Sequence, residues 1–517
     1  MKRISPPTGA DLDHLASRWG FTIPDDQRAD CLSILGIVYT VLDGLGELGE
    51  ISDVAEPGGT APGGRASTPA DRDSDPLNAV RRWCQVLGRS TGPLAGRRVG
   101  VKDSISVAGI PMSCGSRFLG ELTPAEDSTV VKRILGAGGS IVATLNMDDL
   151  AFSGGGESSA YGPVRNPFSH DRSAGGSSGG SAAALYYEGV DVTLGCDQGG
   201  SIRVPAAWCG VLGLKPTHGL VPYTGIAGID QTFDHVGPLG LRAEDLALLL
   251  QVVAGADPED PRQRQGDVRA DYVAAVENAP DSLSETRIGL VLEGFDPSSG
   301  TTEEVARSVS GAIDRMQDLG ATVEEVSVPA HLKAGSISFW GFVEGMTALM
   351  LGGGNGYHWP GRYWPELATA MSEAFEARAD ALPMQVKAAL MLGSHVAPLR
   401  GEMYGRAQNL RPWLRRDYDA ALERCDVLLM PTTPDMPFQL GDNSSLADRV
   451  LRGWTVLTHT APTDMTGHPA LSLPATSSDG LPVGVMLIGR HFDEERLLSV
   501  ARTYERAVGW EPVARHR

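Results

Sequence analysis

Two blocks rich in glycine and serine constrain the fold of this chain more than any other feature. Residues 175–184 read GGSSGGSAAA and residues 196–206 read CDQGGSIRVPA, on either side of the strand-like segment 190–194. Glycine at this density lets the backbone approach a ligand closely and adopt angles that other residues avoid. In each block a serine precedes small or apolar helix formers, so N–H groups at a helix start can point at a developing negative charge. One such tract is typical of a surface loop, whereas two around one strand predict a pair of anion-binding turns.

A lysine in a predicted strand is the second candidate feature. Residues 98–105 read RVGVKDSI, and Lys102 is one of only six lysines, all other cationic residues being arginine. Arginine keeps its proton in proteins, whereas desolvation lowers the pKa of lysine, so a buried lysine can act as a base. For a lone strand lysine, a snorkelling or ion-paired side chain is the alternative.

The main part of the chain is predicted to have an α/β fold. From about Leu77, short Val/Ile segments such as 98–102 and 140–145 alternate with helical stretches such as 129–135, and this alternation is typical of α/β proteins. Further strands are predicted at the segments 426–431, 470–473 and 483–488. Before them, residues 331 to about 400 carry tryptophans, a glycine turn and long helical patterns, which predict a small inserted domain.

The N-terminal part has a different character. Apolar residues such as Leu12, Leu15 and Ala16 recur at spacings of three and four up to about Ile51, which predicts two or three amphipathic helices. Residues 56–76 are rich in proline and glycine, which predicts a linker or surface loop. The expected organisation is the following: an N-terminal helical domain with linker at 1–76, an α/β core at 77–330 and 411–505, an inserted domain at 331–410 and a C-terminal tail at 506–517.

Charge, cysteine usage and hydropathy narrow the classes of function. The net charge of −20 repels phosphate backbones and anionic lipid surfaces, so neither nucleic acid nor a membrane is an expected partner. The six cysteines contain no C-x-x-C pair, so they indicate neither a zinc site nor a disulfide framework and favour a reducing, cytoplasmic location. The sequence has no apolar run of about 18 residues that predicts a membrane span.

Taken together, the lysine segment and the two glycine blocks resemble the amidase signature family of Ser-Ser-Lys hydrolases. The similarity runs from about residue 77 to about residue 505. Its further landmarks are YGPVRNP at 161–167, GLKPT at 213–217, DHVGP at 234–238 and GLPVG at 480–484. The resemblance implies the amidase signature fold, in which helices cover a mixed central β-sheet.

The resemblance also implies roles for individual residues. Ser201 matches the nucleophile, Ser177 the bridging serine that follows a cis peptide bond at Gly176, and Lys102 the base. A neutral lysine acting through a second hydroxyl can take the proton of an attacking serine. The implied oxyanion hole consists of the backbone amides of Gln198, Gly199, Gly200 and Ser201. The expected activity is hydrolysis of carboxylic amides to an acid and ammonia or an amine, through an acyl-enzyme and with neither a cofactor nor a metal.

Within the family, three features are most similar to the enantioselective amidases linked to nitrile hydratase pathways. These are the pair Asp197 and Gln198, the stretch TGHP at 466–469 and the extra N-terminal helical domain. In those enzymes the extension serves dimer formation, so the resemblance implies a homodimer. An ion pair between Asp197 and Arg203 is expected to brace the second glycine block.

Aromatic residues in two segments are candidates for the substrate pocket. Trp340 and Trp359 lie in the inserted segment, and Phe152 closely follows the segment 146–149. Such side chains can line an apolar pocket for an aryl or branched acyl group, with core packing as the alternative. Gly176 and Ser178, next to the bridging serine, are further candidates for substrate contact.

Two other hydrolase chemistries are disfavoured by the sequence. Residues 176–180 satisfy the G-x-S-x-G pattern of α/β-hydrolases, but that pattern requires a preceding strand, and residues 168–172 are polar and loop-like. The eleven histidines include no H-E-x-x-H or comparable spacing, which argues against zinc-dependent hydrolysis.

Three alternatives share the same candidate residues. An aryl carbamate, anilide or ester hydrolase would use the same acyl-enzyme. The glutamine-dependent amidotransferase subunit that supplies ammonia for correcting misacylated transfer RNA has the same triad. That protein works with a partner chain and usually begins near the lysine strand, whereas about a hundred residues precede Lys102 here. A binding protein with an inactive site is disfavoured because all three catalytic residues are present.

Overall fold

The computed structural model describes residues 8–19, 21–36, 64–263, 270–354, 356–399, 401–476 and 480–509. The chain divides into two compact units, residues 1–61 and residues 62–517. In the described part of the first unit, α1 (Gly9–Trp19) and a helix at 28–36 follow the expected amphipathic pattern. Leu12 and Ala16 of α1 are buried, while Leu15 is 42% exposed.

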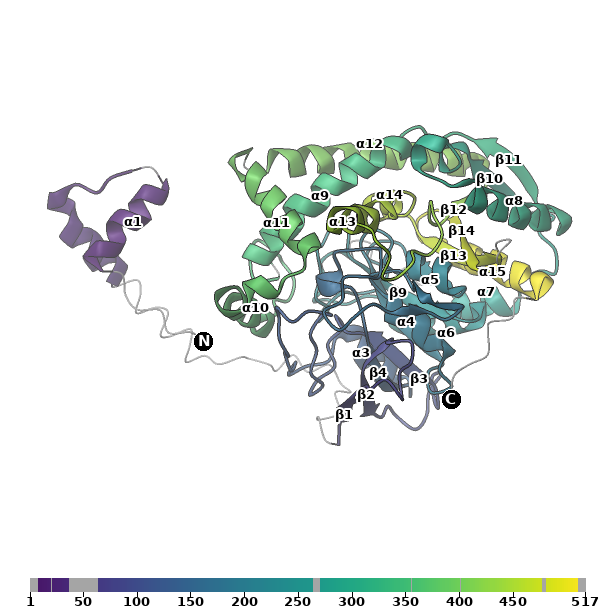
Figure 1. The fold of residues 1–517 in the computed structure, drawn as a ribbon, viewed down its shortest axis with the longest axis horizontal. Helices are drawn as coiled ribbons and strands as arrows, with labels where there is room; N and C mark the ends of the chain where they lie inside the picture. Colours follow the sequence, from purple (N-terminus) through teal and green to yellow (C-terminus); the bar gives the residue numbers. More distant parts are fainter. Residues whose placement is uncertain are drawn as a thin grey trace. The chain divides into compact units, whose positions relative to one another are not determined.

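The second unit is organised around one large β-sheet (Figure 1). Its strands in chain order are β1 (Ala66–Pro69), β2 (Val80–Val86), β3 (Arg98–Lys102), β4 (Ser140–Leu145), β7 (Val192–Asp197), β8 (Leu212–Lys215), β9 (His235–Gly240), β10 (Arg287–Val291), β11 (Thr322–Val326), β12 (Val427–Pro431), β13 (Ala470–Thr476) and β14 (Pro482–Ile488). Their spatial order is β1-β2-β4-β3-β7-β9-β8-β13-β14-β12-β10-β11.

The sheet contains separate regions of parallel and of antiparallel pairing. Strand β3 pairs in parallel with both β4 and β7, and β10 does so with both β11 and β12. The strands between these two parallel regions pair antiparallel. The prediction of a mixed central sheet is therefore confirmed, and strands from the first and last thirds of the chain meet in it.

Helices cover both faces of the sheet. The α-helices of this unit are α3 (Thr129–Gly136), α4 (Gly179–Ala183), α5 (Arg203–Cys209), α6 (Ala243–Val253), α7 (Tyr272–Glu277), α8 (Glu303–Asp318), α9 (His331–Leu351), α10 (Pro365–Ala377), α11 (Met384–Val396), α12 (Glu402–Arg424), α13 (Leu446–Thr455), α14 (Ala461–Thr466) and α15 (Glu494–Val508). The short 3-10 helices are η1 (Asp25–Gln27) in the first unit and, in the second, η2 (Asp149–Ala151), η3 (Ala184–Tyr186), η4 (Leu292–Gly294), η5 (Pro297–Ser299), η6 (Ala379–Ala381) and η7 (Ala397–Leu399).

The strand period of two divides the core between the two faces. In β12, Val427 and Leu429 pack in the cluster that contains residues of α3, α6, α8 and α15, whereas Leu428 and Met430 pack with residues of α9, α12 and α14. In β3, Val99 belongs to the first of these clusters. Because alternate residues point to opposite faces, Lys102 lies on the face that carries α4 and α5.

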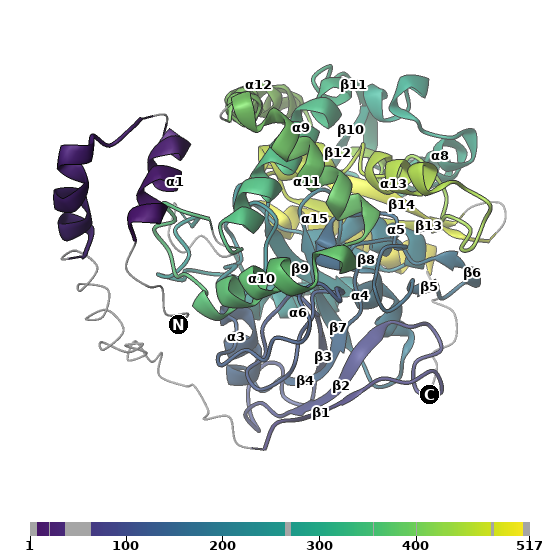
Figure 2. The ribbon, with the colours of Figure 1, turned by 60° about the vertical axis from the view of Figure 1, so that its left-hand side comes forward.

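The segment after residue 331 forms the predicted long helices. Figures 1 and 2 both show α9, α11 and α12 side by side, and α9 contacts both of the other two. Of the predicted glycine turn at 352–356, the described residues 352–354 form a turn directly after α9.

Two segments differ from the sequence-based expectation. Residues 66–69, expected in a linker or loop, form the edge strand β1, which pairs antiparallel with β2 and is anchored by the ion pair of Arg65 with Asp127 at 2.6 Å. Residues 168–172, expected to be a loop, largely overlap β6 (Ser169–Ser173), which pairs with β5 (Arg165–Asn166) in a separate small sheet. In both cases main-chain pairing at an edge supplies the stabilisation, so no apolar pattern is needed.

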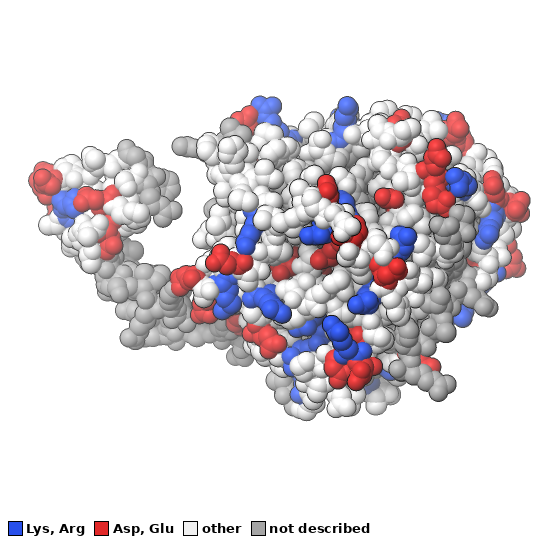
Figure 3. All heavy atoms as spheres, in the orientation of Figure 1, with Lys and Arg blue, Asp and Glu red and all other residues white. Residues whose placement is uncertain are grey.

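The surface and the helices bear on possible partners. On the face drawn in Figure 3, acidic and basic side chains are interspersed. Among the described helices, none has both the length and the apolar character that a membrane crossing requires.

Candidate active site

Lys102 lies in an interior strand of the sheet and has no exposed surface. It is the last residue of β3, between the parallel neighbours β4 and β7. Its Nζ donates a hydrogen bond of 2.7 Å to Ser177 Oγ and lies 3.4 Å from the carbonyl oxygen of Cys196. Burial lowers the pKa of Lys102, although the charges of Cys196, Asp197 and Asp148 oppose this effect. The amine therefore approaches the neutral form that a base requires.

The turn that carries Ser177 is fixed by close packing around Gly176. The peptide bond between Gly176 and Ser177 is cis, as the family resemblance implies. The amide of Gly176 donates to the carbonyl oxygen of Gly154 at 2.9 Å, and a Cβ at Gly176 would come within 1.9 Å of Asp148 Oδ2. A side chain at this position is therefore excluded. Burial raises the pKa of Asp148 to about 6, opposed by the amides of Ser158 and Gly156 that donate to its carboxylate.

Ser201 lies in the turn between β7 and α5, and this turn contacts the first. The amide of Ser178 donates to the carbonyl oxygen of Ser201 at 3.1 Å. Gly200 has a φ of +145°, and a Cβ there would lie 2.1 Å from Thr460 Oγ1, so only glycine is accommodated. Within the described residues, no protein acceptor is assigned to the amides of 198–201. These four consecutive N–H groups are available to an oxyanion.

An ion pair holds the turn that carries Ser201 in place, as expected from the sequence. Arg203 and Asp197 are both fully buried and meet through Nη2 and Oδ1 at 2.9 Å. Arg203 also contacts Asp464 at 2.7 Å and donates to Thr463 Oγ1 at 2.6 Å. Burial acts to raise the pKa of Asp197, but the charge and hydrogen bonds of Arg203 outweigh it and hold that pKa at about 2. The turn is therefore tied to α14 through an ionised pair.

Residues near 460 belong to the site but are not among the candidates from the sequence. Thr460 Oγ1 donates to the carbonyl oxygen of Gly199 at 2.5 Å, and the carbonyl oxygen of Thr460 accepts from Arg203. Leu457 lies against Gly199, with Cδ1 at 3.3 Å from the position of a Cβ. No local pattern marks these residues, because 261 positions separate Thr460 from its partner Gly199.

An apolar wall lies next to the second turn. The ring of Phe342 in α9 also lies 3.3 Å from the Cβ position at Gly199. Phe152 is 7% exposed and packs edge-to-face on Trp454, which in turn contacts Phe339 at a centroid distance of 5.3 Å. Phe152 therefore belongs to an aromatic cluster that also contains side chains of α9 and α13.

The remaining candidates lie in different surroundings. Ser178 Oγ donates to the carbonyl oxygen of Cys196 at 3.0 Å, which directs this hydroxyl at β7. Trp340 is half-buried beside Phe339 in α9. Trp359 lies in the connection between α9 and α10, where its amide donates to Tyr363 Oη at 2.9 Å. The rings of Trp454 and Phe339 thus connect Phe152 with Trp340, whereas Trp359 lies in a different segment.

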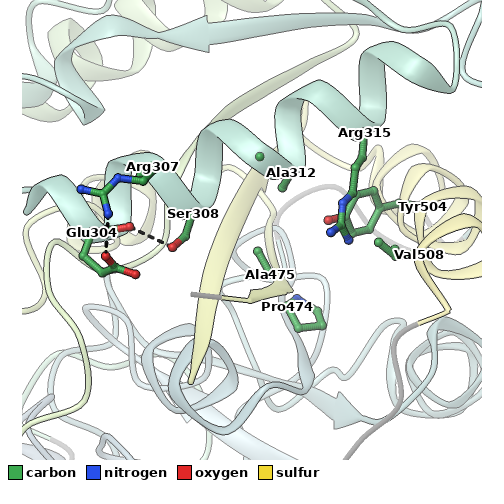
Figure 4. Close-up of a pocket in the computed structure, with 10 residues that line it drawn as sticks. Glu304, Arg307, Ser308, Ala312, Arg315, Pro474, Ala475, Tyr504 and Val508 are labelled. Carbon is green, nitrogen blue, oxygen red and sulfur yellow. Dashed lines mark hydrogen bonds and ion pairs between the residues drawn. The ribbon is translucent and has the colours of Figure 1, made fainter. Parts of the chain in front are cut away.

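A surface pocket of about 170 Å³ lies elsewhere, between α8, the end of β13 and α15 (Figure 4). In it, Arg307 pairs with Glu304 at 3.0 Å, Ser308 donates to the carbonyl oxygen of Glu304, and Arg315 lies beside Tyr504. Glu304, Arg307 and Ser308 are thus bonded to one another, and the lining of the pocket shares no residue with the two turns.

Comparison with known proteins finds relatives that match most of this chain. A family profile described as "Amidase" matches residues 76–498. An enantioselective amidase of Rhodococcus rhodochrous is 37% identical over 99% of this chain and 98% of its own length. A glutamyl-tRNA(Gln) amidotransferase subunit of Trichormus variabilis is also 37% identical, over 82% of this chain and 86% of its own. A crystal structure of a peptide amidase with the competitive inhibitor chymostatin aligns with a TM-score of 0.67 and 29% identity, covering 82% of this chain and 86% of that one.

Proposed function

Because the chain belongs to the amidase family and is an amide-hydrolysing enzyme, we propose that Ser201, Ser177 and Lys102 carry out the hydrolysis. The observation that carries the proposal is the 2.7 Å hydrogen bond from the buried amine of Lys102 to Ser177 Oγ. Burial away from solvent disfavours the charged form of a lysine. The neutral amine is then available to accept a proton through the hydroxyl that it touches.

Acylation of Ser201 is the first half of the proposed reaction. Ser201 Oγ attacks the amide carbonyl carbon while its proton passes to Ser177 Oγ and the proton of Ser177 passes to Lys102 Nζ. The carbonyl oxygen becomes an oxyanion that accepts from the free amides of residues 198–201. The C–N bond then breaks, and the leaving nitrogen takes a proton from Lys102 through Ser177.

Deacylation follows the same path with water. Water attacks the ester carbon of the acyl-enzyme and gives a proton to Ser177, which gives its own proton to Lys102. The second tetrahedral intermediate breaks the bond to Ser201 Oγ, which takes a proton back from Lys102 through Ser177. The products are a carboxylic acid and ammonia or an amine, and the enzyme returns to its starting protonation state.

Mass spectrometry of the protein mixed with a panel of amides tests the nucleophile. We expect an acyl group on Ser201 in the wild type and none in Ser201→Ala. Substitution of Ser201 or Ser177 by alanine is expected to lower turnover at least ~100-fold. An acyl group on another residue, or normal turnover in Ser201→Ala, would overturn the assignment.

Coverage of the relatives favours an independent amidase over a component of an amidotransferase. The Rhodococcus enzyme matches 99% of this chain, whereas the Trichormus amidotransferase protein matches 82%. We expect the purified chain alone to release ammonia from a simple amide. Activity that required a second protein would instead favour the amidotransferase role.

The aromatic cluster next to Gly199 suggests which acyl groups the site accommodates. Phe342 and Leu457 lie directly against the turn, and Phe152 packs behind them on Trp454. A wall of this kind favours aryl or branched apolar acyl groups. We expect Phe152→Ala to raise KM for an aryl amide more than for acetamide, while equal effects on both substrates would remove Phe152 from the pocket.

We also propose that the enzyme is a homodimer assembled through its N-terminal domain and that residues 331–410 form a separate wall of the pocket. Phe21 and Ile34 are 55% and 61% exposed in the first unit, which leaves apolar surface for a second copy. Glutamate at both positions is expected to shift the protein from dimer to monomer in light scattering.

The six free cysteines suit a reducing cytoplasmic location.

A further inference from the structure

Three potential metal ligands meet at a place that the proposed reaction does not use. Asp419 comes from α12, His468 from the connection between α14 and β13, and His491 from the connection between β14 and α15. Each offers one ligand atom, and these atoms lie within 4.8 Å of one another. His468 belongs to the TGHP stretch that the sequence analysis singles out and the proposed reaction leaves unexplained.

The hydrogen bonds around His468 resemble the surroundings of a metal ligand. Its Nε2 lies 3.0 Å from Asp419 Oδ1, and its Nδ1 lies 2.8 Å from Thr466 Oγ1. The other carboxylate oxygen, Asp419 Oδ2, accepts from Arg415 at 3.3 Å. A cation placed between Nε2 and Oδ1 leaves both outer contacts in place, because Nδ1 can then donate to Thr466. Such outer partners orient and strengthen metal ligands.

His491 completes the group from the other side. Its Nε2 lies 3.0 Å from the carbonyl oxygen of Thr466, so this nitrogen carries the proton and the lone pair is on Nδ1. The rings of His468 and His491 are 4.2 Å apart. Each ring therefore has one nitrogen directed at Thr466 and one that can face a shared ligand.

We propose that Asp419, His468 and His491 bind a divalent cation of the Zn²⁺ class. Imidazole and carboxylate are the donors that Zn²⁺ uses, at about 2.0–2.2 Å. Tetrahedral geometry with these bond lengths needs ligand atoms about 3.4 Å apart. Metal binding therefore moves His468 Nε2 and Asp419 Oδ1 slightly apart from 3.0 Å and draws together any pair near the 4.8 Å limit. The side chain of Asp419 is 46% exposed, which leaves solvent access for a water as fourth ligand.

The neighbouring cations do not block this site. Arg415 contacts Asp419 Oδ2, so Oδ1, which lies 3.0 Å from His468 Nε2, is the carboxylate oxygen that faces the metal. The amine of Lys215 donates to the carbonyl oxygens of His468 and Pro216, so it is directed at main-chain oxygens. A bound metal therefore links α12 to the connection that precedes β13 and to the connection that follows β14. Its expected role is to stabilise the fold.

Zn²⁺ titration of the untagged, chelator-treated protein tests the proposal, with competition by a chromophoric chelator as the readout. We expect one high-affinity Zn²⁺ per chain and a raised melting temperature. His491→Gln and Asp419→Asn are expected to weaken binding at least ~10-fold, while His395→Gln, an exposed histidine on α11, binds as the wild type does. Co²⁺ in place of Zn²⁺ is expected to give the intense visible absorption of a tetrahedral site.

The outcomes separate the site from unspecific binding. Absence of stoichiometric Zn²⁺ binding, or equal affinity in all four proteins, would overturn the proposal. Because His491→Gln can alter the fold, circular dichroism and amidase turnover of the metal-free variants serve as controls. Asp419→Asn gives the same test at a side chain that is 46% exposed and outside the core.

Discussion

Two buried lysines are each the last residue of a strand in the same sheet, but their hydrogen-bond partners differ. Lys102 is the last residue of β3 and Lys215 the last residue of β8, and neither has exposed surface. Burial lowers the pKa of both, that of Lys215 to about 8. Lys102 donates to a hydroxyl, that of Ser177, whereas Lys215 donates to two main-chain carbonyl oxygens.

This difference separates a base from a structural cation. A hydroxyl can pass its own proton to the amine and take another from a nucleophile, while a carbonyl oxygen has no proton to pass. The charges of Asp464, Asp197 and Glu494 also act on Lys215, where they raise its pKa and so oppose the effect of burial. Burial is therefore common to both lysines, and the hydrogen-bond partner distinguishes their roles.

The largest expected effect is on turnover in Lys102→Met. Methionine keeps the apolar volume but removes the base, so kcat should fall at least ~100-fold with little change in the melting temperature. Steady-state kinetics on an aryl amide and thermal unfolding measure the two quantities. Near-normal kcat at neutral pH would show that the contact with Ser177 is structural, and the two lysines would then be equivalent.

The sequence identifies the catalytic candidates around Lys102, but it does not identify the residues that hold them in position. Lys102, Ser177 and the glycine turns are recognisable because each lies in a contiguous motif. Thr460 and Leu457 reach the turn from 261 and 258 positions away, so only tertiary structure shows them. The edge strand β1 is likewise not predictable from its own residues, which carry no apolar pattern, because its stability comes from pairing with β2.

A smaller loss is expected in Thr460→Val. Its hydroxyl donates to the carbonyl oxygen of Gly199, so valine removes a positioning contact of the turn that carries Ser201. We expect kcat to fall about 10-fold with KM nearly unchanged. Thr460→Ser keeps the hydroxyl and should retain wild-type kcat. Equal losses in both variants would indicate that packing, and not the hydrogen bond, positions the turn.

A shift in the pH profile is expected in Asp148→Asn. The pKa of Asp148 is raised to about 6, so above this pH its negative charge favours the protonated form of Lys102. Removing that charge lowers the pKa of Lys102 further, and the acid limb of kcat/KM should move to lower pH. Asp149→Asn is the matched control, because burial raises the pKa of Asp149 to about 8 and this group is already neutral at pH 7. A limb that stays in place, or moves equally in both variants, would contradict the coupling.

The smallest effect on turnover is expected in Lys215→Met, where stability changes instead. Removing this amine leaves two buried carbonyl oxygens without their donor and takes a positive charge away from the nearby acidic groups, so the free energy of unfolding should fall by about 3 kcal/mol, while kcat stays within a few-fold of wild type. The sign of the pH dependence gives a second check. Between the folded pKa of about 8 and the ordinary value of 10.5, the unfolded state binds more protons at Lys215, so wild-type stability gains from rising pH in this window. Lys102 contributes equally to both proteins and cancels, so the stability difference between wild type and Lys215→Met should grow as the pH rises from 8 to 10.5. A difference that stays constant across this window, measured by denaturant unfolding, would mean that Lys215 is not the titrating group.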